Sequence, residues 1–176
     1  GQVRQVGGDD DLGQAGVRQA QRLVLVVEGD QDQVGVNSLG QRLAAEEGRR
    51  LECPWGVMSF EPHPRSFFRP DEPVFRLTPA ALKARLVAAL GSSFMAVLDF
   101  DRALSELSPE EFVRLHLVER FAVRHVVMGY DFHFGKGRKG SPATMTELGA
   151  SFGFDAGRDA GGKTGRCRTG KVARRP

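Results

Sequence analysis

Two loops hold most of the side chains that could bind a ligand. The first spans residues 60–68 and reads Phe-Glu-Pro-His-Pro-Arg-Ser-Phe-Phe. Its two prolines stiffen the backbone, and the adjacent side chains of Phe67 and Phe68 follow them. A rigid apolar wall of this kind suits a flat aromatic ligand. The alternative, which residue spacing alone favours because pockets are few in any protein, is a structural turn whose phenylalanines pack in the core.

The second loop spans residues 129–140 and reads Gly-Tyr-Asp-Phe-His-Phe-Gly-Lys-Gly-Arg-Lys-Gly. Its glycines allow a ligand to approach the backbone closely, and its three cations suit a phosphate group. The loop also offers the carboxylate of Asp131 and three aromatic side chains. A flexible, solvated loop explains the same composition equally well, so both interpretations stay open.

Two stretches match phosphate-binding patterns, and we interpret both as chance matches. Residues 135–140 fit G-x-G-x-x-G, but five residues separate them from the preceding predicted strand. That fingerprint needs a tight strand–turn–helix. Residues 157–164 fit the P-loop pattern G-x-x-x-x-G-K-T, but the twelve residues that follow are rich in glycine and arginine. They offer neither the helix nor the carboxylate-bearing strand that a P-loop requires.

The histidines and cysteines lack the spacing of a metal site, so we predict no metal ligands. The four histidines are His63, His116, His125 and His133, and the two cysteines are Cys53 and Cys167. Two cysteines also exclude a disulfide scaffold. Because catalytic triads are assembled in space rather than along the chain, the sequence identifies no catalytic residue.

Alternating strands and helices are predicted around the two loops. The strands cover residues 55–60, 94–100 and 125–129, and the helices cover 79–90, 109–120 and 144–152. Thr78 and Ser108 each precede a proline, which is typical of a helix N-cap. The order of these elements predicts an α/β domain with a parallel sheet, and ligands of such sheets bind beyond the carboxyl ends of the strands.

Each of the first two helices has an apolar repeat that we expect to face the core. The repeat of the first helix is Leu82, Leu86, Ala89 and Leu90, and that of the second is Phe112, Leu115, Val118 and Ala122.

The two ends of the chain differ in composition from the middle. All eight glutamines lie within the first fifty residues, which contain no aromatic residue. Only Leu23–Val27, as a buried strand, and residues 38–50, as a helix, resemble elements there. Residues 155–176 carry seven Lys or Arg against two Asp, a charge of +5, and we expect them to be disordered. The remaining residues carry 18 basic and 20 acidic side chains, a charge of −2.

Composition bounds the class of protein. The chain has 176 residues, of which 40% are hydrophobic, enough for one domain with a core. The longest aliphatic run is only Leu23–Val27, so we expect no membrane span, no secretory signal and a cytoplasmic location. The basic tail could bind nucleic acid in a salt-dependent way, but no recognised nucleic-acid motif accompanies it, so we expect no such partner.

Residues from about 49 to 154 resemble bacterial FAD synthetases, specifically the FMN adenylyltransferase module of the bifunctional riboflavin kinase/FAD synthetase. The resemblance rests on four pieces in the family's order. They are residues 57–64 with the FEPHP turn, 76–79 with Lys83, 100–112 with their Leu-Ser-Pro-Glu-Glu-Phe run, and 125–140 with the G-x-D-F-x-F-G-x-G-R-x-G loop.

The resemblance implies a Rossmann-like nucleotidyltransferase domain that transfers AMP from ATP to FMN, giving FAD and pyrophosphate, with Mg²⁺ on the phosphates. It also implies that Pro62, Pro64 and Phe68 border the isoalloxazine. It further implies that Phe134 and Asp131 lie between flavin and nucleotide, Phe134 as a flavin-binding and Asp131 as a nucleotide-binding residue. The partners are then the small molecules FMN and ATP. The riboflavin kinase domain that usually follows in such proteins is missing from this sequence.

Two signatures of that family are also missing. No histidine precedes His63, so the N-terminal H-x-G-H segment that holds the ATP phosphates cannot be present. The S-S-T-x-x-R segment expected after the last helix is absent as well. We therefore expect residues 1–48 to be an atypical, non-native segment, the domain of residues 49–154 to be incomplete at both ends, and the 155–176 tail to be non-native too. Activity should be impaired, and the alternative is a non-catalytic flavin-binding remnant.

Overall fold

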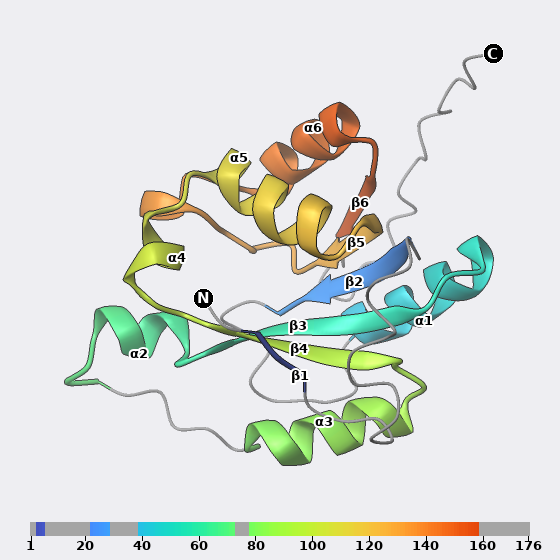
Figure 1. Ribbon diagram of the computed structural model, residues 1–176, viewed down its shortest axis with the longest axis horizontal. Helices are drawn as coiled ribbons and strands as arrows, with labels where there is room; N and C mark the ends of the chain where they lie inside the picture. Colours follow the sequence, from blue (N-terminus) through green and yellow to red (C-terminus); the bar gives the residue numbers. More distant parts are fainter. Residues whose placement is uncertain (1–2, 6–21, 29–38, 73–77, 159–176) are drawn as a thin grey trace.

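A six-stranded sheet forms the centre of the computed structural model, which describes residues 3–5, 22–28, 39–72 and 78–158 (Figure 1). The strand order is β1-β4-β3-β2-β5-β6. The strands are β1 (Val3–Gln5), β2 (Leu23–Val27), β3 (Trp55–Glu61), β4 (Phe94–Asp99), β5 (Val123–Met128) and β6 (Asp155–Arg158). Neighbours among β2 to β6 are parallel, and only β1 runs antiparallel, to β4. The predicted α/β fold with a parallel sheet is confirmed.

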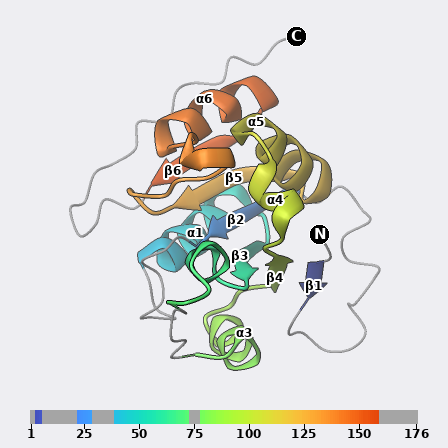
Figure 2. The ribbon, with the colours of Figure 1, turned by 90° about the vertical axis from the view of Figure 1, so that its left-hand side faces the viewer.

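Helices cover both faces of the sheet. They are α1 (Leu39–Leu51), α2 (Pro64–Phe68), α3 (Ala80–Ala89), α4 (Arg102–Glu106), α5 (Pro109–Phe112), the π-helical η2 (Val113–Arg120), the short 3₁₀ turn η3 (Lys136–Arg138) and α6 (Pro142–Phe152). Helices α1 and α3 pack on one face, and α5, η2 and α6 pack on the other (Figures 1 and 2).

The central strand β2 joins the two halves of the core. Leu23, Leu25 and Val27 belong to the apolar cluster under α5, η2 and α6, whereas Val24 and Val26 belong to the cluster under α1 and α3. An aliphatic run buried on both faces is typical of a central parallel strand. The predicted strand at Leu23–Val27 and the predicted helix at residues 38–50 are therefore confirmed, the helix as α1.

The connections of the sheet change direction at β2. From β2 the chain moves to β3 and β4 on one side, and it then crosses to β5 and β6 on the other side. The carboxyl ends of β2 and β5 therefore mark the place where open α/β sheets bind their ligands. Both ligand-candidate loops leave the sheet at this edge, the first after β3 and the second after β5.

The predicted helix at 109–120 is confirmed, but its buried face differs from the expected one. The hydroxyl of Ser108 accepts the backbone N–H of Glu111 at 3.2 Å, and the Glu111 carboxylate accepts the Ser108 N–H at 2.8 Å, which is the predicted capping box. After α5 the helix becomes π-helical, with wider i→i+5 turns. The buried side chains are consequently Phe112, Val113, Leu117 and Phe121, and Ala122 is exposed.

The buried face of α3 was predicted wrongly. Leu82, Leu86 and Leu90 remain 47%, 39% and 41% exposed, whereas Ala84 and Val87 pack against the sheet. Nearly every residue of this helix is apolar, so the repeat of leucines did not define a single face. Its N-cap residue is Pro79, one position after the expected Thr78.

The end of the described chain also differs from expectation. Residues 155–158, which we expected to be disordered, form β6 and pair with β5. The sequence Asp-Ala-Gly-Arg has a low strand propensity, so this strand depends on its backbone pairing with β5. Residues 159–176, with most of the P-loop-like match, lie outside the described residues. Among the helices that the structure describes, none is long and apolar enough to cross a membrane.

Candidate ligand-binding site

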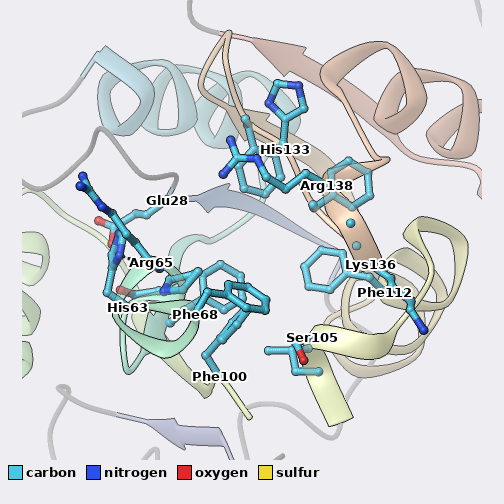
Figure 3. Close-up of a pocket in the computed structure, with 18 of the residues that line it drawn as sticks. Glu28, His63, Arg65, Phe68, Phe100, Ser105, Phe112, His133, Lys136 and Arg138 are labelled. Atoms are coloured by element: carbon cyan, nitrogen blue, oxygen red, sulfur yellow. Dashed lines mark hydrogen bonds between the residues drawn. The ribbon is translucent and has the colours of Figure 1, made fainter. Parts of the chain in front are cut away.

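A cavity of about 790 Å³ lies at the carboxyl edge of the sheet, and both candidate loops line it (Figure 3). Its walls come from the ends of β2, β3 and β4, from α2 and α4, and from residues 131–138. The cavity therefore lies where the crossover at β2 predicts a ligand. Its volume suits a small organic molecule.

The first loop presents an aromatic wall to the cavity. Prolines hold its shape: the Glu61–Pro62 peptide bond is cis, and Pro64 begins the short helix α2. The Nδ1 atom of His63 accepts the backbone N–H of Arg65 at 3.2 Å and caps that helix. This local geometry turns the two following phenylalanines back toward β4.

Phe68 is the exposed member of this wall. Its ring centroid lies 5.2 Å from that of Phe67 and 5.8 Å from that of Phe100, both in edge-on contacts. Its side chain nevertheless remains 64% exposed and lines the cavity. The structure thus combines the two interpretations of the loop, since Phe67 packs against its neighbours while Phe68 offers an aromatic surface to a ligand.

The second loop is folded rather than open. Phe132 and Phe134 are buried and stacked at 5.6 Å with an interplanar angle of 15°. Phe134 and Gly140 exchange two backbone hydrogen bonds, of 3.1 Å and 2.9 Å. Residues 133 and 136–139 of the loop are exposed, whereas the buried, stacked rings of Phe132 and Phe134 form a second aromatic wall of the cavity.

The connection between α4 and α5 anchors the second loop. The backbone N–H of Lys136 donates to the Leu107 carbonyl at 2.7 Å, and Lys136 Nζ lies 2.5 Å from the Glu106 carboxylate. The hydrogen bond from the Lys136 ammonium to the Glu106 carboxylate, together with the lysine charge, lowers the pKa of Glu106. Gly135, at φ +72°, lies so close to Pro109 that an added Cβ would meet the Pro109 nitrogen at 2.7 Å. Close packing therefore fixes the position of this wall.

Charged side chains surround the aromatic walls. Arg65 and Arg69 reach the exposed carboxylate of Glu72, at 3.8 Å and 3.4 Å. Deeper in the cavity wall, the Lys83 ammonium forms an ion pair with the carboxylate of Glu28. Most cations at the cavity therefore have an acidic neighbour.

Four of the five residues singled out from the sequence line the cavity. Pro64 and Phe68 do so from the first loop, and Asp131 and Phe134 do so from the second. Pro62 is the exception, since it is exposed and does not belong to the lining. The two loops thus meet at one cavity, as the shared sheet edge predicts.

Sequence reasoning missed several lining residues. Phe100 directly follows β4 at the same sheet edge, so the rule that found the two loops could also have found it. Phe112 comes from the helical layer, and its ring lies 5.6 Å from that of Phe134. Glu28 and Lys83 are 55 positions apart, and no spacing signal connects them.

The described residues offer no protein-made metal site. In residues 3–5, 22–28, 39–72 and 78–158, no group of three or more His, Cys, Asp or Glu side chains could hold a metal ion. His116 is half-buried on η2 beside the ring of Phe112, and His125 is buried on β5; the Nδ1 atom of each is buried without a hydrogen-bond partner among the described residues. Burial, with a smaller contribution from Arg120, lowers the pKa of His116 to about 4. Burial also lowers the pKa of His125.

Comparison with known proteins identifies one family. A family model described as FAD synthetase matches residues 39–160. This match begins inside the segment 1–48 that we expected to be atypical, and it extends past residue 154.

Two similar curated proteins from different bacteria share one name. A bifunctional riboflavin kinase/FMN adenylyltransferase of Escherichia coli (strain K12) is 36% identical over 110 residues, which cover 62% of this chain and 35% of that protein. The protein of the same name from Listeria monocytogenes serovar 1/2a is 41% identical over 115 residues, with the same coverage of 62% and 35%. The chain therefore spans about a third of the length of the curated relatives it matches.

A solved structure supports the fold. The crystal structure titled as a macrolide-efflux protein from Streptococcus pneumoniae superposes with a TM-score of 0.64 and 21% sequence identity. The superposed region covers 78% of this chain and 45% of the Streptococcus pneumoniae chain. At this identity the similarity concerns the fold alone.

Proposed function

Because this chain belongs to the FAD synthetase family, we propose that its cavity binds the isoalloxazine of FMN and that its capacity for adenylyl transfer is impaired. The complete reaction moves AMP from ATP to FMN and releases pyrophosphate. Flavin binding and transfer are separate claims, since they depend on different residues.

One observation carries the flavin proposal: the two aromatic loops line one cavity. Phe68 enters it from α2, and the stacked pair of Phe132 and Phe134 enters it from the other loop. A flat, largely apolar ring system is the ligand that such walls bind best. The exposure of Phe68 supports the same ligand, because a stacked ring would remove its apolar surface from water.

Within this proposal each singled-out residue has a role. Phe68, Pro64 and Phe134 contact the isoalloxazine, and Asp131 stands between flavin and nucleotide. Pro62 shapes the turn that directs Pro64 and Phe68, since it does not reach the cavity itself.

Adenylyl transfer needs the polyphosphate to be held in line and its charge neutralised. We assign no residue to that task, because the H-x-G-H and S-S-T-x-x-R segments are absent from the sequence. Mg²⁺ would enter on the phosphates of ATP, since the described part of the chain supplies no metal-binding cluster. The reaction therefore lacks its main source of charge stabilisation.

Flavin fluorescence tests the binding claim. Titrating the chain into FMN should quench the emission with saturation, and Phe68→Ala should weaken binding about tenfold, because one stacked ring is worth roughly 1 kcal/mol beyond the area it buries. Leu90→Ala is the matched control, since Leu90 is exposed at the C-cap of α3 and does not line the cavity. Equal affinities for Phe68→Ala and Leu90→Ala would place the flavin elsewhere.

Product analysis tests the second claim. Incubation of the chain with FMN, ATP and Mg²⁺ should yield FAD at less than a hundredth of the rate of a complete family member, the scale of loss expected when oxyanion-stabilising groups are removed. FAD formation at a comparable rate would show that other residues hold the triphosphate and that the chain is an active adenylyltransferase.

A further inference from the structure

Helix α3 carries three leucines that no described part of the chain covers. Leu82, Leu86 and the C-cap residue Leu90 are exposed, whereas the smaller Ala84 and Val87 pack against the sheet. Figures 1 and 2 show α3 at the periphery, with no described helix or strand on its outer side. Because a helix that is apolar on all sides is normally buried, this face is expected to be covered in the assembled protein.

The outer surface of α3 carries little charge. Arg85 is its exposed cation, and the helix contains no acidic residue. Its other cation, Lys83, turns to the cavity and pairs with Glu28. A nucleic acid or an anionic membrane surface is held by several cations, so neither suits this face. A second apolar helix surface matches it better.

The even spacing of the leucines makes this face complementary to itself. They lie four residues apart, along the ridge by which helices commonly pack. When two copies of α3 lie antiparallel with Leu86 at a two-fold axis, Leu82 of each copy meets Leu90 of the other. Ala89 is exposed beside this stripe, and its small side chain lets the two helix axes approach closely.

We propose that Leu82, Leu86 and Leu90 form a leucine face that binds the leucine face of a second copy of this chain, as an antiparallel helix pair. The inference is independent of the proposed function, because none of the three leucines lines the cavity. From Ala80 to Leu90, seven residues are exposed, whereas a stable dimer uses roughly 20–30 residues on each side. The dimer is therefore weak, with a dissociation constant on the order of 10–100 µM.

Arg85 gives this dimer a distinctive salt dependence. In the antiparallel pair the two Arg85 side chains lie on the same flank, close to the axis, because each directly precedes Leu86. Both are exposed, so salt screens their repulsion. The association should therefore become tighter as the sodium chloride concentration rises. Arg85→Gln should associate at least twofold more tightly than the parent at low salt, and this difference should disappear at high salt.

Sedimentation equilibrium of the full chain over a hundredfold range of concentration tests the inference. The weight-average mass of the parent should rise from that of the monomer toward twice that value. Leu86→Glu places two carboxylates at the axis and should weaken the association at least tenfold. Leu39→Glu is the matched control, because Leu39 lies on α1 and is 42% exposed, against 39% for Leu86. It should stay within twofold of the parent.

Three results would overturn the proposal. They are a monomeric parent throughout the range, equal association of Leu86→Glu and Leu39→Glu, and an association of the parent that weakens as salt is added. If Leu86→Glu does not fold, Leu86→Ser removes the same apolar contact without adding a charge, and it should weaken the association several-fold. An unchanged association of Leu86→Ser would contradict the leucine face as decisively.

Discussion

Different side chains give the cavity lining its aromatic and its charged parts. Phe68 supplies an exposed ring, Phe134 supplies a buried one, and Glu28 forms an ion pair with Lys83 at the end of the central strand. The two loops that carry these phenylalanines were identified because each follows a predicted strand, and the resemblance to FAD synthetases singled out Phe68 and Phe134 within them. Glu28 could not, because only the fold brings it to Lys83, 55 positions away.

His116 should make the stability of the domain depend on pH. Its pKa falls from 6.5 in the unfolded chain to about 4 in the folded one, mainly through burial. The unfolded state therefore binds more protons between these values. The contribution of His116 to the free energy of unfolding should be fully present above pH 6.5 and should be lost as the pH falls toward 4.

Urea unfolding at a series of pH values checks this expectation. His116→Phe removes the titrating group, and it should flatten the decline by about 1 kcal/mol after allowance for the partial solvent access of this side chain. The lowered pKa of His125 should leave a residual slope in the variant. Parallel profiles for the parent and His116→Phe would show that this histidine is not buried in its neutral form.

Among the helices and strands, features set by local sequence could be predicted, whereas features set by tertiary packing could not. The helix start at Ser108 was predicted, because a cap and a proline act within one turn, whereas α6 begins at Pro142, two positions before the predicted start at residue 144. The buried face of α3 and the π-helical turns of η2 could not, because the contacts with the sheet decide them. Strand β6 has no side-chain signature and depends on pairing with β5.

The second loop packs against the connection between α4 and α5, and a substitution at this contact should destabilise the domain. Gly135→Ala would place a methyl group 2.7 Å from the Pro109 nitrogen at a positive φ, so the loop must move or the methyl must clash. We expect it to cost about 1–3 kcal/mol of stability and to weaken FMN binding several-fold.

Gly137→Ala is the matched control for this substitution. Gly137 lies in the same loop at φ +65°, but an added Cβ would find nothing within 4 Å. Its ψ of 21° is in the left-handed helical region, so Gly137→Ala carries a moderate backbone cost, without the contact with Pro109 and without the ψ of 171° at Gly135 that is open almost only to glycine. Urea unfolding and FMN titration of both variants should separate them by at least 1 kcal/mol, and equal losses would mean that Pro109 does not hold the loop.

At the scale of the whole molecule, the sheet organises the site. Five parallel strands direct their carboxyl ends to one edge (Figure 1). The two loops line one cavity at that edge. The unusual composition of the N-terminal region hides the fact that β2 is a central strand of the sheet. Only the five aliphatic residues of β2 indicate it. The resemblance to FAD synthetases identified the family, whereas the placement of the cavity depended on the three-dimensional structure.

The position of a bound flavin tests this account most directly. Intermolecular nuclear Overhauser effects should be measured between the isoalloxazine methyl protons of FMN and the assigned phenylalanine rings of the full chain. We expect effects to both Phe68 and Phe134, which reach the cavity from different loops. Saturable FMN binding with effects to neither ring would contradict the claim that these two aromatic walls form one flavin site.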